Sequence, residues 1–407
     1  MAEMTGEVPA GSEGALTGVR VLDLGLLVQA PQAAQLLGDL GADVIKIELP
    51  GMGDQGRWIP ISLEDLRPPF FIGCNRGKRS VTLDLRMEAG RDVFLKLVET
   101  ADVVLANFVP GTLEGWGLGY DVLSARNPRI ILGCGSTFGP VGRDSKRKGA
   151  DIAGQASGGL IEATGTGPDD MGPVGITLAD HLGSQNLANG VLAALFARER
   201  TGRGQVVEVS LLGGQIFAQA SEYSYAFMTG KTAGHGAGGH NLIPMVYGLL
   251  PTSDGHIVIV GVQVPERARF FALIGRSDLE GVERYMSLLL TPEVRRELFE
   301  DLAVTFREKT TAEWESILEG GGFRYAAVRT HLEVADDPAV YENGYLQHIE
   351  HPDWGPSSAV GCPIRLSDTP ARPGQVAPEL GQHTEEVLLE HGFDWEQIAA
   401  LREQGAL

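Results

Sequence analysis

The sequence predicts an α/β protein with an open parallel sheet in a large domain and a smaller α+β domain. Short apolar runs alternate with helix-like stretches through the first third of the chain, as is typical of βαβ units around a parallel sheet. That alternation is lost beyond about residue 225. The chain has 407 residues, 43% hydrophobic and 21% charged, and at roughly 100 to 200 residues per domain this length gives two or three globular domains.

The first strand is expected over residues 19–24, where the apolar run is continuous. Pro31 suits the first turn of the helix that follows, and Gly41 suits the left-handed end of that helix. Strand, helix and strand then recur along the chain. Further strands are expected over residues 44–48, 80–85, 103–106 and 130–133, with a helix over residues 88–100.

A longer helix is expected to begin near Asp180 and to end in a cluster of cationic residues followed by glycine. It follows a Gly-rich and Asp-rich segment, residues 139–175, which should consist of loops and short helices. Beyond the helix a strand is expected over residues 205–212. Two more strands are expected within residues 247–264, joined at Asp254-Gly255, because this dipeptide favours a hairpin turn.

These elements divide the chain into three parts. Residues 1–224 are expected to form the first part of the large domain, residues 225–330 the small α+β domain, and residues 331–407 a linker and C-terminal helices. The acidic amphipathic tail from Thr384 to Leu407 should return to pack on the large domain.

Charge and composition restrict the partners. Lys and Arg number 33 against 53 Asp and Glu, and the net charge of −20 disfavours nucleic acid and anionic membranes. No stretch approaches the roughly 18 apolar residues of a membrane span, and the acidic start differs from a secretion signal, so we expect a cytoplasmic protein. Cys74, Cys134 and Cys362 are too scattered to suggest a disulfide framework or a metal site.

Common catalytic motifs are missing from the sequence. There is no GxSxG, HExxH, CxxC or EF-hand spacing, and the run Gly73–Lys78 is one residue too short for a phosphate-binding P-loop. The run Gly234–Gly239 matches GxGxxG, but a dinucleotide site needs a strand before it and a helix after it, and neither is expected here. A loop, or a lid over an active site, fits this run better.

Two basic clusters stand out in this acidic chain. They lie next to strand ends, and each holds four cations: Arg76, Lys78, Arg79 and Arg86 in the first, and Arg143, Lys146, Arg147 and Lys148 in the second. Two interpretations remain open for both clusters: a local anion site at the ligand edge of the sheet, or solvated loops.

Asp180 lies at the expected start of the long helix. The helix dipole and free backbone N–H groups there should keep its carboxylate ionised, and Gly183 leaves room beside it. An N-capping aspartate without chemistry is nevertheless the commoner explanation of this spacing. Spacing alone therefore does not make Asp180 a catalytic residue.

Seven stretches together carry a family resemblance. They are residues 18–24, 41–48, 75–85, 107–114, 178–183, 198–205 and 380–388. With these motifs in this order, nearly the whole chain resembles the class III CoA-transferases, which include formyl-CoA and carnitine CoA-transferases and have the alpha-methylacyl-CoA racemases as relatives. The resemblance implies an open Rossmann-like sheet, a smaller α+β domain and an interlocked dimer, either a homodimer or a heteromer with a paralogous subunit.

The resemblance also implies site residues. Asp180 matches the covalent nucleophile of the family, and Gly234, Gly236, Gly238 and Gly239 match its active-site loop, which keeps water away from the intermediates. The positions that match family contacts to CoA are Val28, Gln29, Leu83, Arg86, Asn107 and Lys148. Relatives often carry arginine at the positions of Val109 and Gly115, so phosphate contacts are expected elsewhere, at Arg76 or Arg147.

The activity implied is transfer of CoA from a donor such as succinyl-CoA or acetyl-CoA to a carboxylic acid. A mixed anhydride and an aspartyl-CoA thioester would be the intermediates. CoA thioesters enter as substrates, and no metal or permanently bound cofactor is expected. The acceptor acid is not legible from the sequence.

Two alternatives remain. Racemases of the family carry His before the Asp of a Gly-x-Asp motif, whereas Ala150 occupies that position here and cannot transfer a proton. His181 adjoins Asp180, but successive helix residues point in different directions, so we assign it a structural role. A non-catalytic CoA-binding subunit of a heteromeric transferase is the other alternative.

Overall fold

The chain divides into two compact units. The computed structural model describes residues 13–236 and 238–407. Unit 1 contains the described residues up to Gly158 together with Ile176–Gln215 and Asp337–Leu407, and unit 2 contains Gly159–Gly175 and Ile216–Asp336. The whole of the predicted small-domain range, residues 225–330, falls in unit 2, which also takes in residues on both sides of that range. Each unit has its own hydrophobic core.

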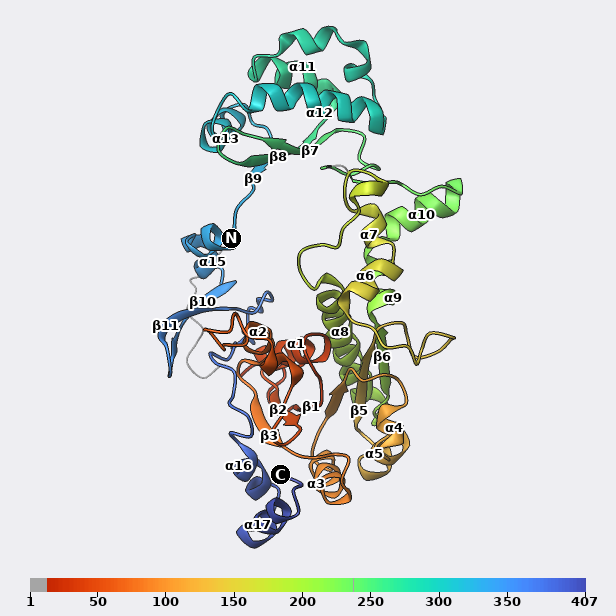
Figure 1. The fold of residues 1–407 in the computed structure, drawn as a ribbon, viewed down its shortest axis with the longest axis vertical. Helices are drawn as coiled ribbons and strands as arrows, with labels where there is room; N and C mark the ends of the chain where they lie inside the picture. Colours follow the sequence, from red (N-terminus) through yellow and green to blue (C-terminus); the bar gives the residue numbers. More distant parts are fainter. Residues whose placement is uncertain (1–12, 237) are drawn as a thin grey trace. The chain divides into compact units, whose positions relative to one another are not determined.

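Six parallel strands form the sheet of unit 1, in the order β3-β2-β1-β4-β5-β6 (Figure 1). Their bounds are β1 Arg20–Asp23, β2 Asp43–Glu48, β3 Arg79–Thr82, β4 Val103–Ala106, β5 Ile131–Ser136 and β6 Val206–Ser210. In register, Val21 lies between Val44 of β2 and Val103 of β4. The chain order reverses between β1 and β4, and open α/β sheets bind ligands at the carboxyl ends of strands beside such a reversal. The open Rossmann-like parallel sheet expected from the sequence is therefore confirmed.

Helices cover both faces of this sheet, because neighbouring residues of each strand point to opposite sides. Val21 packs with α1 (Gln29–Asp39) and α8 (Leu178–Thr201), whereas Leu22 belongs to the core of the other face. That second face is covered by α3 (Glu88–Val98), α5 (Tyr120–Arg126) and the C-terminal helices α16 (Thr384–Glu390) and α17 (Trp395–Glu403). The helix α8 ends at Gly202, which adopts φ 68° as a left-handed stop.

Shorter elements complete unit 1. They are η1 Gln55–Trp58, α2 Pro69–Asn75, α4 Thr112–Gly115, α6 Asp151–Ser157, α15 Pro338–Glu342, β10 Leu346–His351 and β11 Gly355–Val360, with α9 Leu211–Ala218 crossing the boundary to unit 2. The strands β10 and β11 form a two-stranded antiparallel hairpin. None of the described helices has both the length and the apolar composition that a membrane span requires.

Unit 2 is built around an antiparallel sheet in the order β7-β8-β9. Its strands are β7 Val246–Pro251, β8 His256–Val262 and β9 Tyr325–Ala327, and the expected hairpin at Asp254-Gly255 joins the first two. Its helices are α7 Leu160–Ala163, η2 Pro168–Asp170, α10 Ala220–Thr229, α11 Val264–Leu273, η3 Ser277–Gly281, η4 Glu283–Met286, α12 Pro292–Phe306, α13 Thr311–Gly320 and α14 His331–Ala335. Phe270, Phe306 and Trp314 are prominent in the core between sheet and helices.

Candidate active site

The first turn of α8 carries Asp180 as its third residue, and another carboxylate caps that turn. Asp151, at the start of α6, accepts hydrogen bonds through Oδ1 from the backbone N–H of Ala179 at 2.7 Å and of Asp180 at 3.1 Å. Thr177, at the N-cap position, makes no capping bond with its side chain. Asp151, and not Asp180, therefore caps this helix, so the capping explanation for Asp180 does not apply.

The environment of Asp180 disfavours its charged form. Burial, together with the negative charge of Asp151, raises the pKa of Asp180 to about 7. Among the described residues, none donates a hydrogen bond to the Asp180 carboxylate. With a pKa of about 7, the carboxylate is only about half ionised at pH 7, which is less than the helix dipole alone led us to expect.

The buried side chain of Gln29 lies beside the first turns of α8. It is 3% exposed, and it is packed between Gly135 of β5 and Gly183 of α8. A Cβ atom on Gly183 would lie 2.6 Å from Gln29 Nε2, and one on Gly135 would lie 2.2 Å from Gln29 Oε1. Gln29 Nε2 has no hydrogen-bond partner within the described part of the chain. The absence of a side chain at Gly183 therefore makes room for Gln29. Its unpaired Nε2 amide group lies beside the residue one turn from Asp180.

We expect Gly183→Ala to displace Gln29, because the new methyl group would lie inside contact distance of both Gln29 Nε2 and Leu211 Cδ2. Small misplacements in an active site cost up to about 100-fold in rate, so turnover should fall between about 10-fold and 100-fold. The control is Gly115→Ala in α4, where a Cβ atom meets nothing within 4 Å. Steady-state assays of both variants test this, and equal rates would remove Gln29 from the site.

A tight loop after β1 presents the first turn of α1. Leu27 adopts φ 63°, a left-handed conformation that costs a leucine about 1 to 2 kcal/mol. Three hydrogen bonds hold the loop: Asn107 Oδ1 accepts from Leu26 N–H and Asn107 Nδ2 donates to Leu26 O, both at 2.8 Å, and Asp54 Oδ1 accepts from Leu27 N–H at 2.9 Å. The carboxamide of Asn107, a predicted CoA contact, is thus engaged by the loop itself.

Two buried lysines lie beneath this loop. Lys46 Nζ contacts Asp54 Oδ2 at 2.9 Å and Asp23 Oδ2 at 3.6 Å, and donates to Gly25 O at 2.8 Å. Lys78 Nζ pairs with Asp23 Oδ2 at 2.7 Å, and burial lowers its pKa to about 8. Both ammonium groups are therefore paired inside the protein, and they hold in place Asp23 and Asp54, the acids beneath the loop after β1.

Neither interpretation of the first basic cluster fits Arg76 and Lys78, which are buried, whereas Arg86, a predicted CoA contact, is exposed. Each of its four cations contacts a carboxylate: Arg76 with Asp39, Lys78 with Asp23, Arg79 with Asp43, and Arg86 with Asp84. The sequence spacing did not reveal this, because most of these acids lie on other elements.

The second cluster keeps its cations at the surface. Arg143, Lys146, Arg147 and Lys148 are exposed, and Asp144 is their neighbouring acid. Arg147 stacks over Phe138, and Lys146 donates to Pro110 O. The remaining predicted CoA positions, Val28 and Leu83, have buried side chains, so a ligand would meet their main chain.

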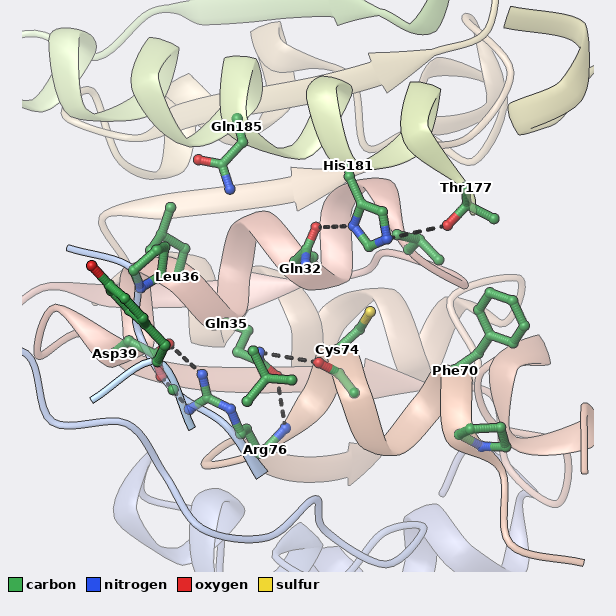
Figure 2. Close-up of a pocket in the computed structure, with 17 residues that line it drawn as sticks. Gln32, Gln35, Leu36, Asp39, Phe70, Cys74, Arg76, Thr177, His181 and Gln185 are labelled. Carbon is green, nitrogen blue, oxygen red and sulfur yellow. Dashed lines mark hydrogen bonds and ion pairs between the residues drawn. The ribbon is translucent and has the colours of Figure 1, made fainter. Parts of the chain in front are cut away.

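A pocket of about 540 Å³ opens between α1, α2 and the start of α8 (Figure 2). His181 faces it, with Nδ1 2.6 Å from Gln32 Oε1 and Nε2 3.3 Å from Thr177 Oγ1. Burial lowers the pKa of His181, so the ring is neutral at pH 7, and burial raises the pKa of the Cys74 thiol in the same wall to about 11. Sequence reasoning missed this pocket, because part of its wall comes from Tyr345 and the β10–β11 hairpin.

The glycine-rich loop lies in unit 2. Helix α10 precedes it and strand β7 follows it, the reverse of a dinucleotide fingerprint. Asn241 Nδ2 donates to the carbonyls of Ala233 at 2.8 Å and His235 at 2.6 Å, and Gly239 pairs with Gly248 of β7. Within Gly234–Gly239 only residue 237 is outside the described residues. The role of Gly234, Gly236, Gly238 and Gly239 as the active-site loop stays a prediction.

Comparison with known proteins places the chain in a family. The family model "CoA-transferase family III" matches residues 16–384. The succinyl-CoA:glutarate CoA-transferase of Mus musculus is 32% identical over 378 residues, covering 92% of this chain and 86% of that protein. The succinyl-CoA:mesaconate CoA-transferase of Haloarcula marismortui is 33% identical over 396 residues, covering 94% and 97%.

Solved structures agree with this assignment. The crystal structure of a CAIB/BAIF family protein from Brucella suis superimposes with a TM-score of 0.82 at 29% identity, covering 93% of this chain and all of that one. The matched range includes every strand of the unit 1 sheet and the first turn of α8. The chain therefore belongs to CoA-transferase family III, as an enzyme that transfers CoA.

Proposed function

We propose that this enzyme transfers CoA from succinyl-CoA or a similar acyl-CoA to a small carboxylic acid, with Asp180 as the covalent nucleophile. The observation that carries the proposal is the Asp180 carboxylate: it is largely buried, has a raised pKa and lacks hydrogen-bond donors among the described residues. A poorly solvated carboxylate is a stronger nucleophile than one satisfied by donors. The names of the relatives support succinyl-CoA as donor.

The proposed reaction consists of four exchanges at carbonyl carbons. An Asp180 oxygen attacks the thioester carbonyl, the C–S bond breaks, and CoA thiolate leaves a mixed anhydride. The thiolate attacks the aspartyl carbonyl, which releases the donor acid and forms an aspartyl-CoA thioester. The acceptor carboxylate attacks that thioester, and the thiolate then attacks the acceptor's carbonyl in the new anhydride, which restores Asp180. Each intermediate keeps the energy of the thioester.

Gln29 suits the oxyanions that form in these steps. Each attack places negative charge on a carbonyl oxygen, and a preorganised N–H donor stabilises that charge most when it has no competing partner. Gln29 Nε2 is such a donor, and its position beside Gly183 is fixed by packing. We assign Gln29 this stabilising role, with the loop at Leu27 and Asn107 holding it in place.

Chemical trapping tests the nucleophile. Enzyme mixed with succinyl-CoA and no acceptor should carry CoA, as intact mass spectrometry would show, and hydroxylamine should convert the loaded residue to a hydroxamate. Peptide mapping should place that hydroxamate at Asp180. A hydroxamate on another residue, or no adduct while transfer proceeds, would contradict the covalent role of Asp180.

The pH profile of kcat/KM should report Asp180, because only the ionised carboxylate attacks. Its pKa near 7 predicts that kcat/KM rises about tenfold per pH unit below 7 and levels off above it. Asp151→Asn keeps an oxygen to cap α8 but removes a negative charge that raises this pKa. The inflection should therefore move to lower pH in this variant. An unmoved inflection would assign the profile to another group.

The two alternative functions predict different experimental results. A racemase would introduce solvent deuterium at the alpha carbon of a 2-methylacyl-CoA, and a non-catalytic subunit would bind CoA without turnover when purified alone. Ala150 cannot transfer a proton, Asp151 is engaged in capping α8, and His181 is held by Gln32 and Thr177. We therefore retain transfer, with a dimer and a cytoplasmic location as predictions that light scattering and fractionation would test.

A further inference from the structure

A second pocket, of about 270 Å³, lies within unit 2 and has the glycine-rich loop as one wall. Its lining comes from that loop, from β7 and from the first turns of α12, and it contains no acidic residue. The residues that matter below are Arg295, Arg296, His235, Tyr247 and Phe299. A pocket lined by arginines and no acids is unusual in a chain with a net charge of −20.

Arg295 forms the buried side of this pocket. It is 5% exposed, and its guanidinium donates to the His240 carbonyl and to Asn241 Oδ1. Asn241 in turn donates to the carbonyls of Ala233 and His235, so Arg295 holds the base of the glycine-rich loop. Burial lowers the pKa of Arg295, and no carboxylate opposes that effect.

A second buried arginine lies behind the same segment. Arg267 is fully buried and donates only to carbonyls, those of Tyr285 at 2.9 Å, Ser287 at 2.6 Å and Pro244 at 3.3 Å. Buried cations are normally paired with acids, because an unpaired charge inside a protein is costly. Two buried arginines thus contact the 240–244 segment, and within the described part of unit 2 neither forms an ion pair with an acid.

Three acids lie on segments that adjoin the pocket lining, and two of them are engaged by other residues. Glu222 contacts His240 Nε2 at 2.9 Å, and Asp170 Oδ2 accepts from Thr166 Oγ1 at 2.7 Å. Glu293 lies in the first turn of α12 and is exposed. Glu293 interacts electrostatically with the exposed Arg296, but among the described residues no carboxylate forms an ion pair with Arg295 or Arg296. The buried charge of Arg295 therefore remains for a ligand.

From this geometry we propose that the pocket binds a small organic carboxylate between Arg295 and Arg296. Arg296 is exposed one residue along α12, and His235 Nδ1 is a buried pocket atom without a partner among the described residues. Tyr247 and Phe299 offer apolar surface for a short carbon chain. Because Arg295 also holds Asn241, the bound carboxylate stabilises the glycine-rich loop. The proposal does not depend on the covalent mechanism.

Calorimetric titration of the full-length enzyme tests the proposal without any acyl-CoA present. Succinate is the probe, the neutral succinamide is its uncharged counterpart, and inorganic phosphate is the competing anion. Succinate should bind saturably, and Arg296→Gln should weaken it about tenfold or more, because one charge-assisted contact is lost. Arg307→Gln, at the exposed C-terminal end of the same helix, should leave the affinity unchanged. Hydrogen exchange of residues 233–241 should slow with succinate in the wild type.

Each other outcome contradicts the proposal. No saturable binding, equal affinity for succinamide, or equal affinity for phosphate would exclude a carboxylate site. An equal loss in the Arg296 and Arg307 variants would point to a nonspecific charge effect. Arg296→Gln is the main variant because its side chain is exposed, so its fold should persist, whereas Arg295 supports the loop. Trapping at Asp180 is unaffected by any of these results, so the two proposals fail separately.

Discussion

Asp180→Asn should reduce CoA transfer by at least about 10⁴-fold, and it should also make the protein more stable at pH 8. The loss follows from removal of the nucleophile, since residues of this kind carry factors of this order or more. The gain in stability follows from the raised pKa of Asp180, because the wild-type fold has to hold a charge that burial and Asp151 disfavour.

The gain has a definite pH dependence. The folded pKa of Asp180, about 7, is above its ordinary value of 3.8, so the ionised group weakens the fold. This penalty is absent below pH 3.8, grows as the pH rises towards 7, and is constant above that. The Tm difference between variant and wild type should therefore be largest at pH 8 and close to zero near pH 4.

Asp254→Asn should change Tm in the opposite direction. Hydrogen bonds from Thr311 lower the pKa of Asp254, so its ionised form is favoured by the fold and its replacement should reduce Tm at pH 8. Thermal unfolding of the three proteins between pH 4 and pH 8 measures both effects. If Asp180→Asn retains CoA transfer, the proposed mechanism is wrong. If its gain in Tm does not depend on pH, the electrostatic explanation of that gain is wrong.

Lys46→Met should lower the free energy of unfolding by about 3 to 5 kcal/mol, the usual cost of removing one partner from a buried ion pair. Without the ammonium group, the carboxylates of Asp23 and Asp54 remain buried, with only Lys78 to compensate Asp23. Urea unfolding monitored by far-UV circular dichroism measures the change. The KM for acyl-CoA should rise in parallel, because Asp54 holds the backbone of Leu27.

Arg86→Gln is the matched control for this prediction. Arg86 also pairs with an aspartate, Asp84, but its side chain is 61% exposed, and exposed pairs contribute little to stability because water screens them. Adding Asp54→Asn to Lys46→Met should restore part of the stability, since the amide oxygen still accepts from Leu27 and one unpaired charge disappears. Equal effects of Lys46→Met and Arg86→Gln would show that the buried network contributes little.

The sequence predicted the sheet well because strand formation there depends on local pattern. Residues 103–106 are an apolar run, and residues 44–48 include Val44, Ile45 and Ile47, so the burial of these side chains requires no knowledge of distant residues. The β10–β11 hairpin was missed for the converse reason: its strands alternate weakly and are half exposed, so they resemble loops. Local sequence patterns therefore predict the strands that form the core, and they fail for half-exposed strands such as β10 and β11.

The candidate site was only partly predictable. Asp180 came from a motif, but its raised pKa depends on Asp151, which is 29 positions away in sequence and meets it only in the fold. Lys46 and Lys78 resemble surface cations until Asp23 and Asp54 are brought beneath the same loop. Arg295 lies in an amphipathic helix and resembles a solvated residue. Charges are interpreted correctly only with their spatial partners, which a single sequence does not give.

The C-terminal helices have a consequence for biosynthesis. Val387, Leu388 and Ile398 complete the core on the face of the sheet that begins with Leu22. Ribosomes add roughly 5 to 20 residues per second, so the core on this face stays incomplete for tens of seconds after its first strand is synthesised. Residues 216–336 of unit 2 are synthesised in one continuous run during that time. During that interval the nascent sheet exposes apolar surface, so slower growth and added chaperones should increase the soluble yield.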